Sequence, residues 1–193
     1  RQVDCKELGG GYVNNWNTNE FSSYVKKLDK KKNIFLARDH GGPWQNNLEI
    51  KKKLTEKQAM KSAKLSFKND IDAGFNFIHI DTSLSLNGTE KSPKKTFNRL
   101  FELYKFCSNY AKSKNKKIYF EIGTEEQSGT TNTPEELRQT LIKVFKFCES
   151  EALPKPSFVV IQSGTKVMET KNLGSFDSPI RVGNEIPPEI QLP

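Results

Sequence analysis

The chain has 193 residues, 34% of them hydrophobic and 28% charged, which is ordinary for a globular protein that buries a core. The net charge of +8 lies partly in short lysine runs such as Lys30–Lys32, so we interpret it as solvated surface and do not expect nucleic-acid binding. The chain contains no run of about 20 apolar residues, so we predict no membrane span. Its three cysteines lack CxxC spacing, which is typical of a reducing, cytoplasmic setting. These properties predict a single domain, residues 1–193, without membrane association.

In chain order, apolar runs of strand length alternate with amphipathic helical segments. The five predicted strands are residues 2–6, 33–37, 75–81, 118–123 and 158–164. The predicted helices cover about 18–28, 55–73, 97–114 and 133–148, and the tail after residue 165 has no convincing element. Such alternation is typical of β/α units, which form a parallel sheet with helices outside it.

Cap signals mark two of these helices. Thr55 with Gln58 forms a capping box, and Gly74 ends the same helix. Thr133 precedes Pro134, a residue favoured at the first helical position.

Two architectures fit a parallel α/β chain. A doubly wound sheet would gather the chemistry in one crevice, but no GxGxxG or P-loop follows any predicted strand, so we do not expect a dinucleotide site. A (β/α)8 TIM-type barrel gathers polar side chains from many strand ends at one mouth, and this is the pattern found here. We therefore predict a barrel that is partial in this chain, with about five β/α units.

The candidate site residues follow the predicted strands. The first set is Asp39 and His40, which stand between an apolar run and the turn Gly41-Gly42-Pro43. The remaining candidates at strand ends are Asp81, Ser83, Glu121, Thr124, Glu125 and Gln162. His79 shares a strand face with Asp81 because alternate residues of a strand point the same way.

Several motifs together resemble one family. They are Gln2-Val3, Gly10-Gly11-Tyr12, Asp39-His40-Gly41-Gly42-Pro43, Ala73-Gly74-Phe75, Ile78-His79-Ile80-Asp81-Thr82-Ser83 and Ile122-Gly123-Thr124-Glu125. The succession resembles the D-tagatose-bisphosphate aldolase subunits usually called non-catalytic, some of which were labelled tagatose-6-phosphate kinase. The resemblance runs from Gln2 to about Gly164 and implies a (β/α)8 barrel related to the class II, metal-dependent aldolases, lacking here its first and last units.

The resemblance also implies roles for individual residues. Asp39 would transfer a proton, His40 would bind Zn²⁺ or another divalent metal, and Glu121 would be an acidic residue beside that metal. His79 is a candidate second ligand. Asp81, Ser83, Thr124, Glu125 and Gln162 are candidates for binding a sugar phosphate. Catalytic zinc normally has three protein ligands, and the chain has only two histidines, so the later histidine ligands of a working aldolase are not present.

Alternatives remain open at this point. Asp39 and His40 could form a structural pair, and His79 could be a buried core histidine. As for function, the chain is either a non-catalytic subunit that binds a sugar phosphate or supports a separate catalytic aldolase, or an active class II aldolase or related lyase or isomerase. A kinase is poorly supported because no phosphate-cradling Gly-Lys-Ser/Thr sequence occurs.

Overall fold

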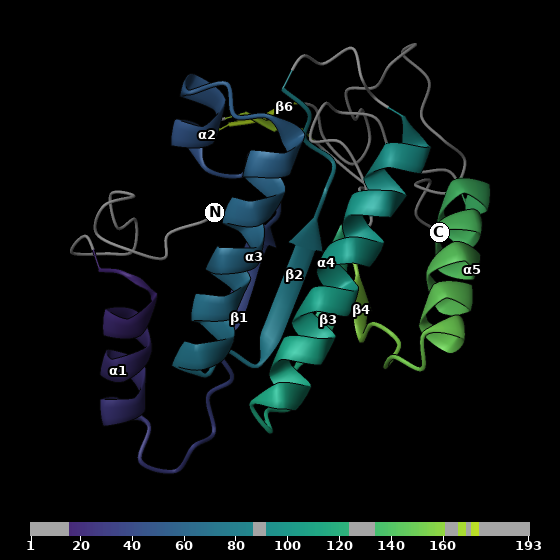
Figure 1. Ribbon diagram of the computed structural model, residues 1–193. Helices are drawn as coiled ribbons and strands as arrows, with labels where there is room; N and C mark the ends of the chain where they lie inside the picture. Colours follow the sequence, from purple (N-terminus) through teal and green to yellow (C-terminus); the bar gives the residue numbers. More distant parts are fainter. Residues whose placement is uncertain (1–15, 87–91, 124–133, 161–165, 169–170, 174–193) are drawn as a thin grey trace. The chain divides into compact units, whose positions relative to one another are not determined.

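The computed structural model describes residues 16–86, 92–123, 134–160, 166–168 and 171–173 (Figure 1). The chain divides into two compact units, and each is treated separately below. The first comprises residues 1–123 and 156–158, and the second comprises residues 124–155 and 159–193.

Helices and strands alternate in the first unit. Its elements are α1 (Thr18–Leu28), β1 (Ala37–Gly41), α2 (Asn47–Lys51), α3 (Glu56–Ala73), β2 (Phe77–Asp81), α4 (Pro93–Ser113) and β3 (Tyr119–Gly123). Strand β4 (Phe158–Val159) begins at the end of this unit. The second unit contains α5 (Pro134–Ser150) and an antiparallel pair, β5 (Lys166–Met168) and β6 (Lys171–Leu173).

The central sheet has the order β1-β2-β3-β4. Strand β2 runs parallel to β1 on one side and to β3 on the other, with Phe77 opposite Tyr119 and Asp81 opposite Gly123. The Ser157 N–H donates a hydrogen bond of 2.8 Å to the Phe120 carbonyl next to β4. Helices α3 and α4 connect the parallel strands, so the predicted succession of β/α units with a parallel sheet is confirmed.

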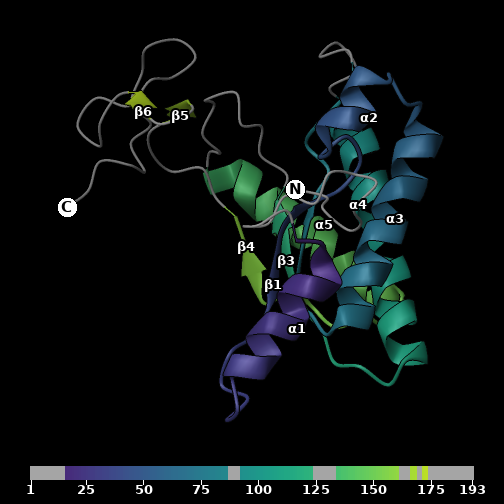
Figure 2. The same cartoon turned by 90° about the vertical axis from the view of Figure 1, so that its left-hand side faces the viewer.

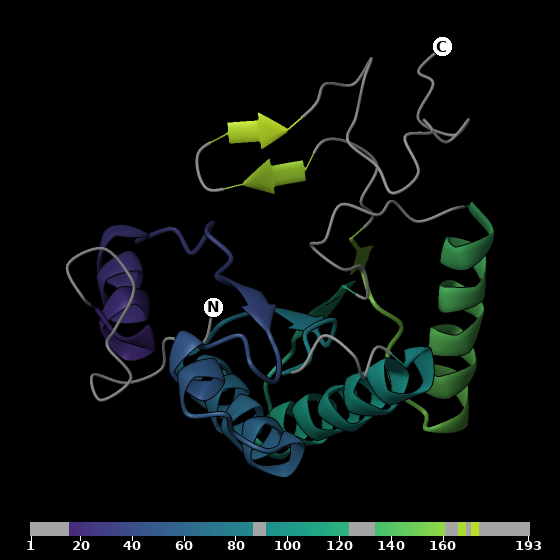
Figure 3. The same ribbon diagram turned by 90° about the horizontal axis from the view of Figure 1, so that it is seen from above.

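The two faces of this sheet differ. Helices α3 and α4 lie on one side of the strands, as the edge-on and top views show (Figures 2 and 3), and they contact each other as well as β1 and β2. The strand residues that are buried and apolar alternate along the chain, as a sheet covered on one face requires. They are Ile78, Ile80, Phe120 and Ile122. The other face carries the chemically reactive side chains.

Helix α1 packs on α3. The Phe21 and Phe75 rings lie 6.3 Å apart, and the Thr18 hydroxyl donates to the buried Asp70 carboxylate. Asp70 also forms a buried ion pair of 2.6 Å with Arg38 of β1. Removing one partner of a buried ion pair would leave the other as an unpaired buried charge. Asp70, which binds both Thr18 and Arg38, therefore holds α1, α3 and β1 together.

The predicted boundaries of α3 are confirmed. The Thr55 hydroxyl accepts the Gln58 N–H, and the Gln58 side chain accepts the Thr55 N–H, which completes the capping box. Gly74 follows the helix with φ of 92°, a left-handed conformation that glycine adopts without strain.

Other predicted boundaries are wrong. The strand expected at residues 33–37 lies instead at Ala37–Gly41, and Ile34 and Phe35 are exposed, because pairing with β2 begins only where Ala37 meets Phe77. Helix α2 and the β5-β6 pair occur where only loops were expected. Helix α1, by contrast, covers residues 18–28 as predicted, with Asn17 as its cap.

No helix in the described part of the chain is long and apolar enough to cross a membrane. Cys107 and Cys148 are free thiols, and both are buried.

Candidate functional site

Asp39 and His40 lie in an irregular stretch of β1. Arg38 pairs with Ile78 and Gly41 pairs with Ile80, so three steps along β1 correspond to two along β2. This is a β-bulge, which re-aims side chains at strand ends. His40 has φ of 43°, a left-handed conformation that is costly for a residue other than glycine. Two consecutive strand residues, which would normally point to opposite faces, are therefore brought to one place.

His40 is anchored by Asp81 at the end of β2. The Nδ1 atom of His40 lies 2.9 Å from Oδ2 of Asp81. The Asp81 carboxylate is buried and also accepts hydrogen bonds from the Ser83 N–H and the Ser83 hydroxyl. The opposite ring nitrogen of His40, Nε2, lies 3.6 Å from Oδ1 of Asp39.

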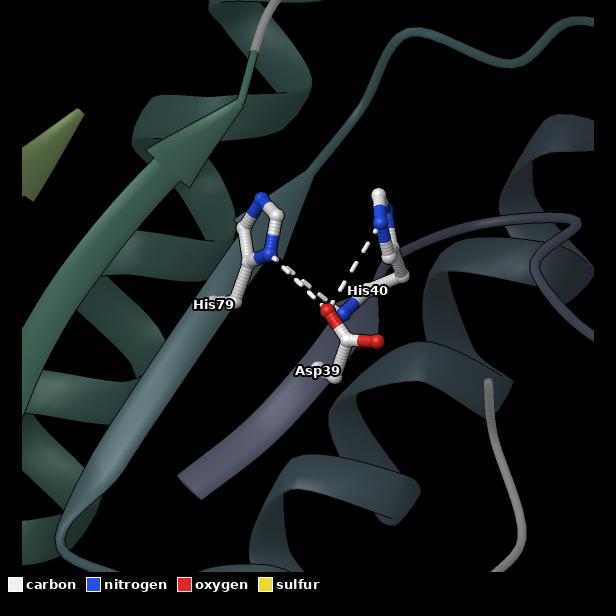
Figure 4. A group of neighbouring side chains, drawn as sticks. All are labelled: Asp39, His40 and His79. Atoms are coloured by element: carbon white, nitrogen blue, oxygen red, sulfur yellow. Dashed lines mark hydrogen bonds and ion pairs between the residues drawn. The ribbon is translucent and has the colours of Figure 1, made fainter. Parts of the chain in front are cut away.

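His79 approaches the same carboxylate oxygen from β2. Its Nδ1 atom lies 3.7 Å from Oδ1 of Asp39 and 3.7 Å from Oε2 of Glu121, and it accepts a long hydrogen bond of 3.4 Å from the His40 N–H. The side chain is only 2% exposed, and its Nε2 atom has no hydrogen-bond partner among the described residues. Figure 4 shows Nδ1 directed toward Asp39 and Nε2 directed away from it.

Asp39, His40 and His79 form a set of donors that could hold a metal ion, with one ligand atom from each lying within 4.8 Å of the others. One carboxylate oxygen and two imidazole nitrogens suit Zn²⁺ and similar divalent metals, and catalytic zinc sites normally use three protein ligands. The separations of 3.6 and 3.7 Å are close to those between ligands about 2 Å from one ion. The donor types therefore fit a divalent metal, and the two imidazole nitrogens, which lie up to 4.8 Å apart, would have to move closer to bind one ion.

The surroundings of His40 and His79 shift their pKa values in opposite directions. The hydrogen bond to Asp81 raises the pKa of His40, with the Asp39 charge adding to the effect and burial reducing it. Burial lowers the pKa of His79, and the nearby positive charge of His40 lowers it further. Burial acts to raise the pKa of Asp81, but the hydrogen bonds from His40 and Ser83 outweigh it and lower that pKa. The site thus keeps Asp81 ionised and His79 neutral near neutral pH.

The structure brings together most of the predicted site residues that it describes. Glu121 lies beside His79, while Ser83 contacts Asp81 and so lies behind His40. Thr124, Glu125 and Gln162 lie outside the described residues.

Gln45 is a member of the site that the sequence did not reveal. Its side-chain amide donates a hydrogen bond of 2.8 Å to Oδ2 of Asp81, the oxygen that also binds His40. Gln45 lies in the loop after β1, where it belongs to no recognised motif. Its proximity to the Asp39-His40 pair in the sequence was the only available signal.

Comparison with known proteins bears on the identity of this site. The family model of the D-tagatose-1,6-bisphosphate aldolase subunit GatZ/KbaZ-like proteins matches residues 2–148, which is most of the chain and includes Asp39, His40 and His79. The chain belongs to the GatZ/KbaZ-like family. The family resemblance seen in the sequence motifs is therefore confirmed.

A solved structure shares the fold of this GatZ/KbaZ-like chain. It is described as a probable tagatose 6 phosphate kinase from Sinorhizobium meliloti 1021, with 21% sequence identity and a TM-score of 0.64. The match covers 86% of the present chain and 42% of the other, so this chain spans less than half the length of that structural relative. Comparison with curated proteins finds no match.

Proposed function

We propose that the chain is the metal-binding part of a tagatose-bisphosphate aldolase-type subunit, which binds a phosphorylated ketose and supports a catalytic aldolase partner. The observation that carries this proposal is the convergence of Asp39, His40 and His79 at the carboxyl ends of β1 and β2 in a member of the GatZ/KbaZ-like family. Parallel β/α proteins gather their ligand-binding residues at such strand ends.

The residues would divide the work as follows. His40 and His79 would hold the metal through Nε2 and Nδ1, since those atoms face Asp39. When bound, a divalent metal supplies a Lewis acid that polarises the carbonyl oxygen of a ketose. Asp39 is 82% exposed, so a sugar can reach its carboxylate, which could accept or return a proton at a hydroxyl of the bound ketose. Glu121, beside His79, would add negative charge that favours the cation.

The closing of a barrel around this site is part of the same proposal. We propose that residues 1–193 belong to one partial (β/α)8 barrel. Four aromatic residues, named here the aromatic row, support it, because they lie on the sheet face that also carries His79 and Glu121. They are Phe35, Phe77, Tyr119 and Phe158, with the Phe77 ring centre 5.9, 5.1 and 5.6 Å from the other three in that order. In a barrel such residues form an interior layer.

The second candidate function is that of a catalytically active class II aldolase or related lyase. The accessible Asp39 carboxylate next to two imidazoles favours it, since a proton-transfer group beside a metal is what aldol cleavage requires. Ser83, Thr124, Glu125 and Gln162 stay candidates for contacts to the sugar phosphate, whereas Asp81 is 2% exposed and bound to His40, Gln45 and Ser83.

The decisive experiment begins with metal binding. The purified chain is stripped with a chelator, titrated with Zn²⁺ and analysed for metal content, alongside His40→Ala, His79→Ala and the control Asp72→Asn, which changes a carboxylate that contacts Tyr110 instead. We expect about one equivalent in the wild type and the control, and loss in both histidine variants.

The metal-loaded chain is then tested with a ketose bisphosphate. Binding without cleavage, together with increased activity of a catalytic aldolase subunit on mixing, would support the subunit role. Cleavage by the chain alone that disappears in Asp39→Asn would establish the second function. A wild type that binds neither metal nor sugar phosphate would contradict both.

A further inference from the structure

The Asp81 carboxylate is held by more donors than a simple turn needs. Oδ2 receives His40 Nδ1 at 2.9 Å and the Gln45 amide at 2.8 Å, while Oδ1 receives the Ser83 N–H at 2.9 Å and the Ser83 hydroxyl at 2.6 Å. Asp81 is 2% exposed, so these protein groups replace the water that would otherwise solvate its charge. An ionised carboxylate only accepts hydrogen bonds. The proton of neutral His40 therefore lies on Nδ1.

The opposite tautomer follows for His79. A backbone N–H can only donate, so the contact from the His40 N–H makes Nδ1 of His79 an acceptor. Neutral His79 then carries its proton on Nε2, the buried atom without a partner among the described residues. The two rings thus turn lone pairs, His40 Nε2 and His79 Nδ1, toward the same Asp39 oxygen, at 3.6 and 3.7 Å.

The loop that supplies Gln45 is itself fixed. The Trp44 N–H donates to Glu49 at 2.7 Å, and the Trp44 indole N–H donates to the Leu54 carbonyl at 2.9 Å. The Arg99 guanidinium lies over the Trp44 ring, 4.8 Å from its centre, a cation–π contact. Gln45 follows Trp44 directly, so this clamp holds the amide on Asp81.

We propose that Asp81, held by Gln45 and Ser83, is a positioning residue that fixes the Nδ1–H tautomer and the ring orientation of His40, so that two histidines of opposite tautomer both turn a lone pair toward Asp39. The consequence for metal affinity rests on the proposed function, but the tautomers themselves do not. Carboxylates behind metal-binding histidines commonly have this effect, and their loss typically weakens metal binding about 10- to 100-fold.

Nitrogen NMR of the ¹⁵N-histidine-labelled, metal-free chain tests the tautomers directly, because two histidines give only four ring nitrogens. At a pH where both rings are neutral, we expect one Nδ1–H and one Nε2–H ring in the wild type. In Asp81→Asn, His40 should lose its fixed tautomer and show a mixture, while His79 should stay as Nε2–H. Asp72→Asn, which changes a carboxylate that contacts Tyr110 instead, should retain the wild-type pattern.

Zn²⁺ titration of the same variants gives the second measurement. Asp81→Asn should bind about 10- to 100-fold more weakly than the wild type. A wild-type His40 with its proton on Nε2, or an unchanged tautomer in Asp81→Asn, would overturn the proposal. Opposite tautomers in a wild type that binds no metal would leave the positioning intact and refute the proposed function.

Discussion

At the scale of single residues, the site depends on how closely the loop after β1 approaches β2. A side chain at Gly42 would collide with the backbone carbonyl oxygen of Asp81, and one at Gly41 would collide with the ring of Phe67. A backbone atom cannot move aside as a flexible side chain can. The glycines of the Asp-His-Gly-Gly sequence are therefore required for the contact that brings His40 to Asp81.

Replacing Gly42 with alanine should separate this loop from the end of β2. We expect a loss of about 1–3 kcal/mol in the free energy of unfolding, measured by urea denaturation, because the added methyl has no room. Lys52→Ala, an exposed change in the same connection, should stay within about 0.5 kcal/mol of the wild type. A Gly42→Ala variant as stable as that control would contradict the close approach.

The two histidines should give opposite slopes of stability against pH. The folded-state pKa of His40 is raised above 6.5, so its contribution is complete below pH 6.5 and is lost as the pH rises through the folded pKa. The folded-state pKa of His79 is lowered, so its contribution is present above pH 6.5 and is lost as the pH falls through the folded pKa. Together they predict greatest stability near pH 6.5 in metal-free protein.

Single variants separate the two histidine contributions in urea unfolding at pH 5 to 8 with a chelator present. His79→Gln should lose stability only on the alkaline side, as His40 deprotonates. His40→Gln should lose it only on the acid side, because burial still depresses the pKa of His79. No other side chain of ordinary pKa titrates in this range, so a parallel pH profile in the two variants would contradict the assignment.

The sequence predicted the members of the site better than their arrangement. Asp39, His40, His79 and Glu121 were recognised because polar residues at ends of parallel strands share one edge of the sheet. The β-bulge was not predictable, because it depends on the pairing register between β1 and β2, and no local sequence pattern marks it. Gln45 was missed for a related reason: its partner, Asp81, lies 36 positions away.

At the scale of secondary structure, the carboxyl end of α3 is stabilised by lysines from other elements. The last turn of α3 contains no basic residue. The Lys26 ammonium of α1 donates to the Ala73 carbonyl, and the Lys116 ammonium after α4 donates to the carbonyls of Ile71 and Asp72 at 2.6 and 2.8 Å. Both satisfy terminal carbonyls and complement the negative end of the helix dipole.

Removing either ammonium group should weaken the anchoring of α3. We expect Lys26→Met and Lys116→Met each to cost about 0.3–1 kcal/mol of unfolding free energy at low ionic strength, and less in 1 M salt. Lys57→Met is the matched control, because Lys57 is exposed in the first turn of the same helix, where positive charge is unfavourable. Equal losses in all three variants would show that the carbonyl contacts contribute nothing.

The elements themselves were predictable where local chemistry decides them. The capping box at Thr55 and the left-handed Gly74 are both set by residues adjacent in sequence, so the bounds of α3 were found. The start of β1 was misplaced because Ile34 and Phe35 resemble buried strand residues, whereas strand pairing begins only at Ala37. Tertiary pairing outweighs local apolar pattern at such boundaries.

At the scale of the whole molecule, an open sheet does not account for the exposed side chains of the aromatic row. Phe35 is 61% exposed and Phe158 is 53% exposed, yet both lie against Phe77 on the face that carries the site. Exposed apolar groups gathered in one place are typical of a surface that another part of a protein covers. The partial barrel proposed above accounts for this, because further strands would cover the same face.

The protein of residues 1–193, prepared alone, should therefore associate through this face. We expect sedimentation velocity to show concentration-dependent self-association and the dye ANS to bind, and both should decrease in Phe35→Ser/Phe158→Ser with little change in unfolding free energy, since these side chains are already largely exposed. The matched control is Ile50→Gln/Leu65→Gln, which removes two exposed apolar side chains outside the aromatic row and should leave association unchanged. If the wild type stays monomeric and binds no ANS, the face does not need the covering strands of a barrel.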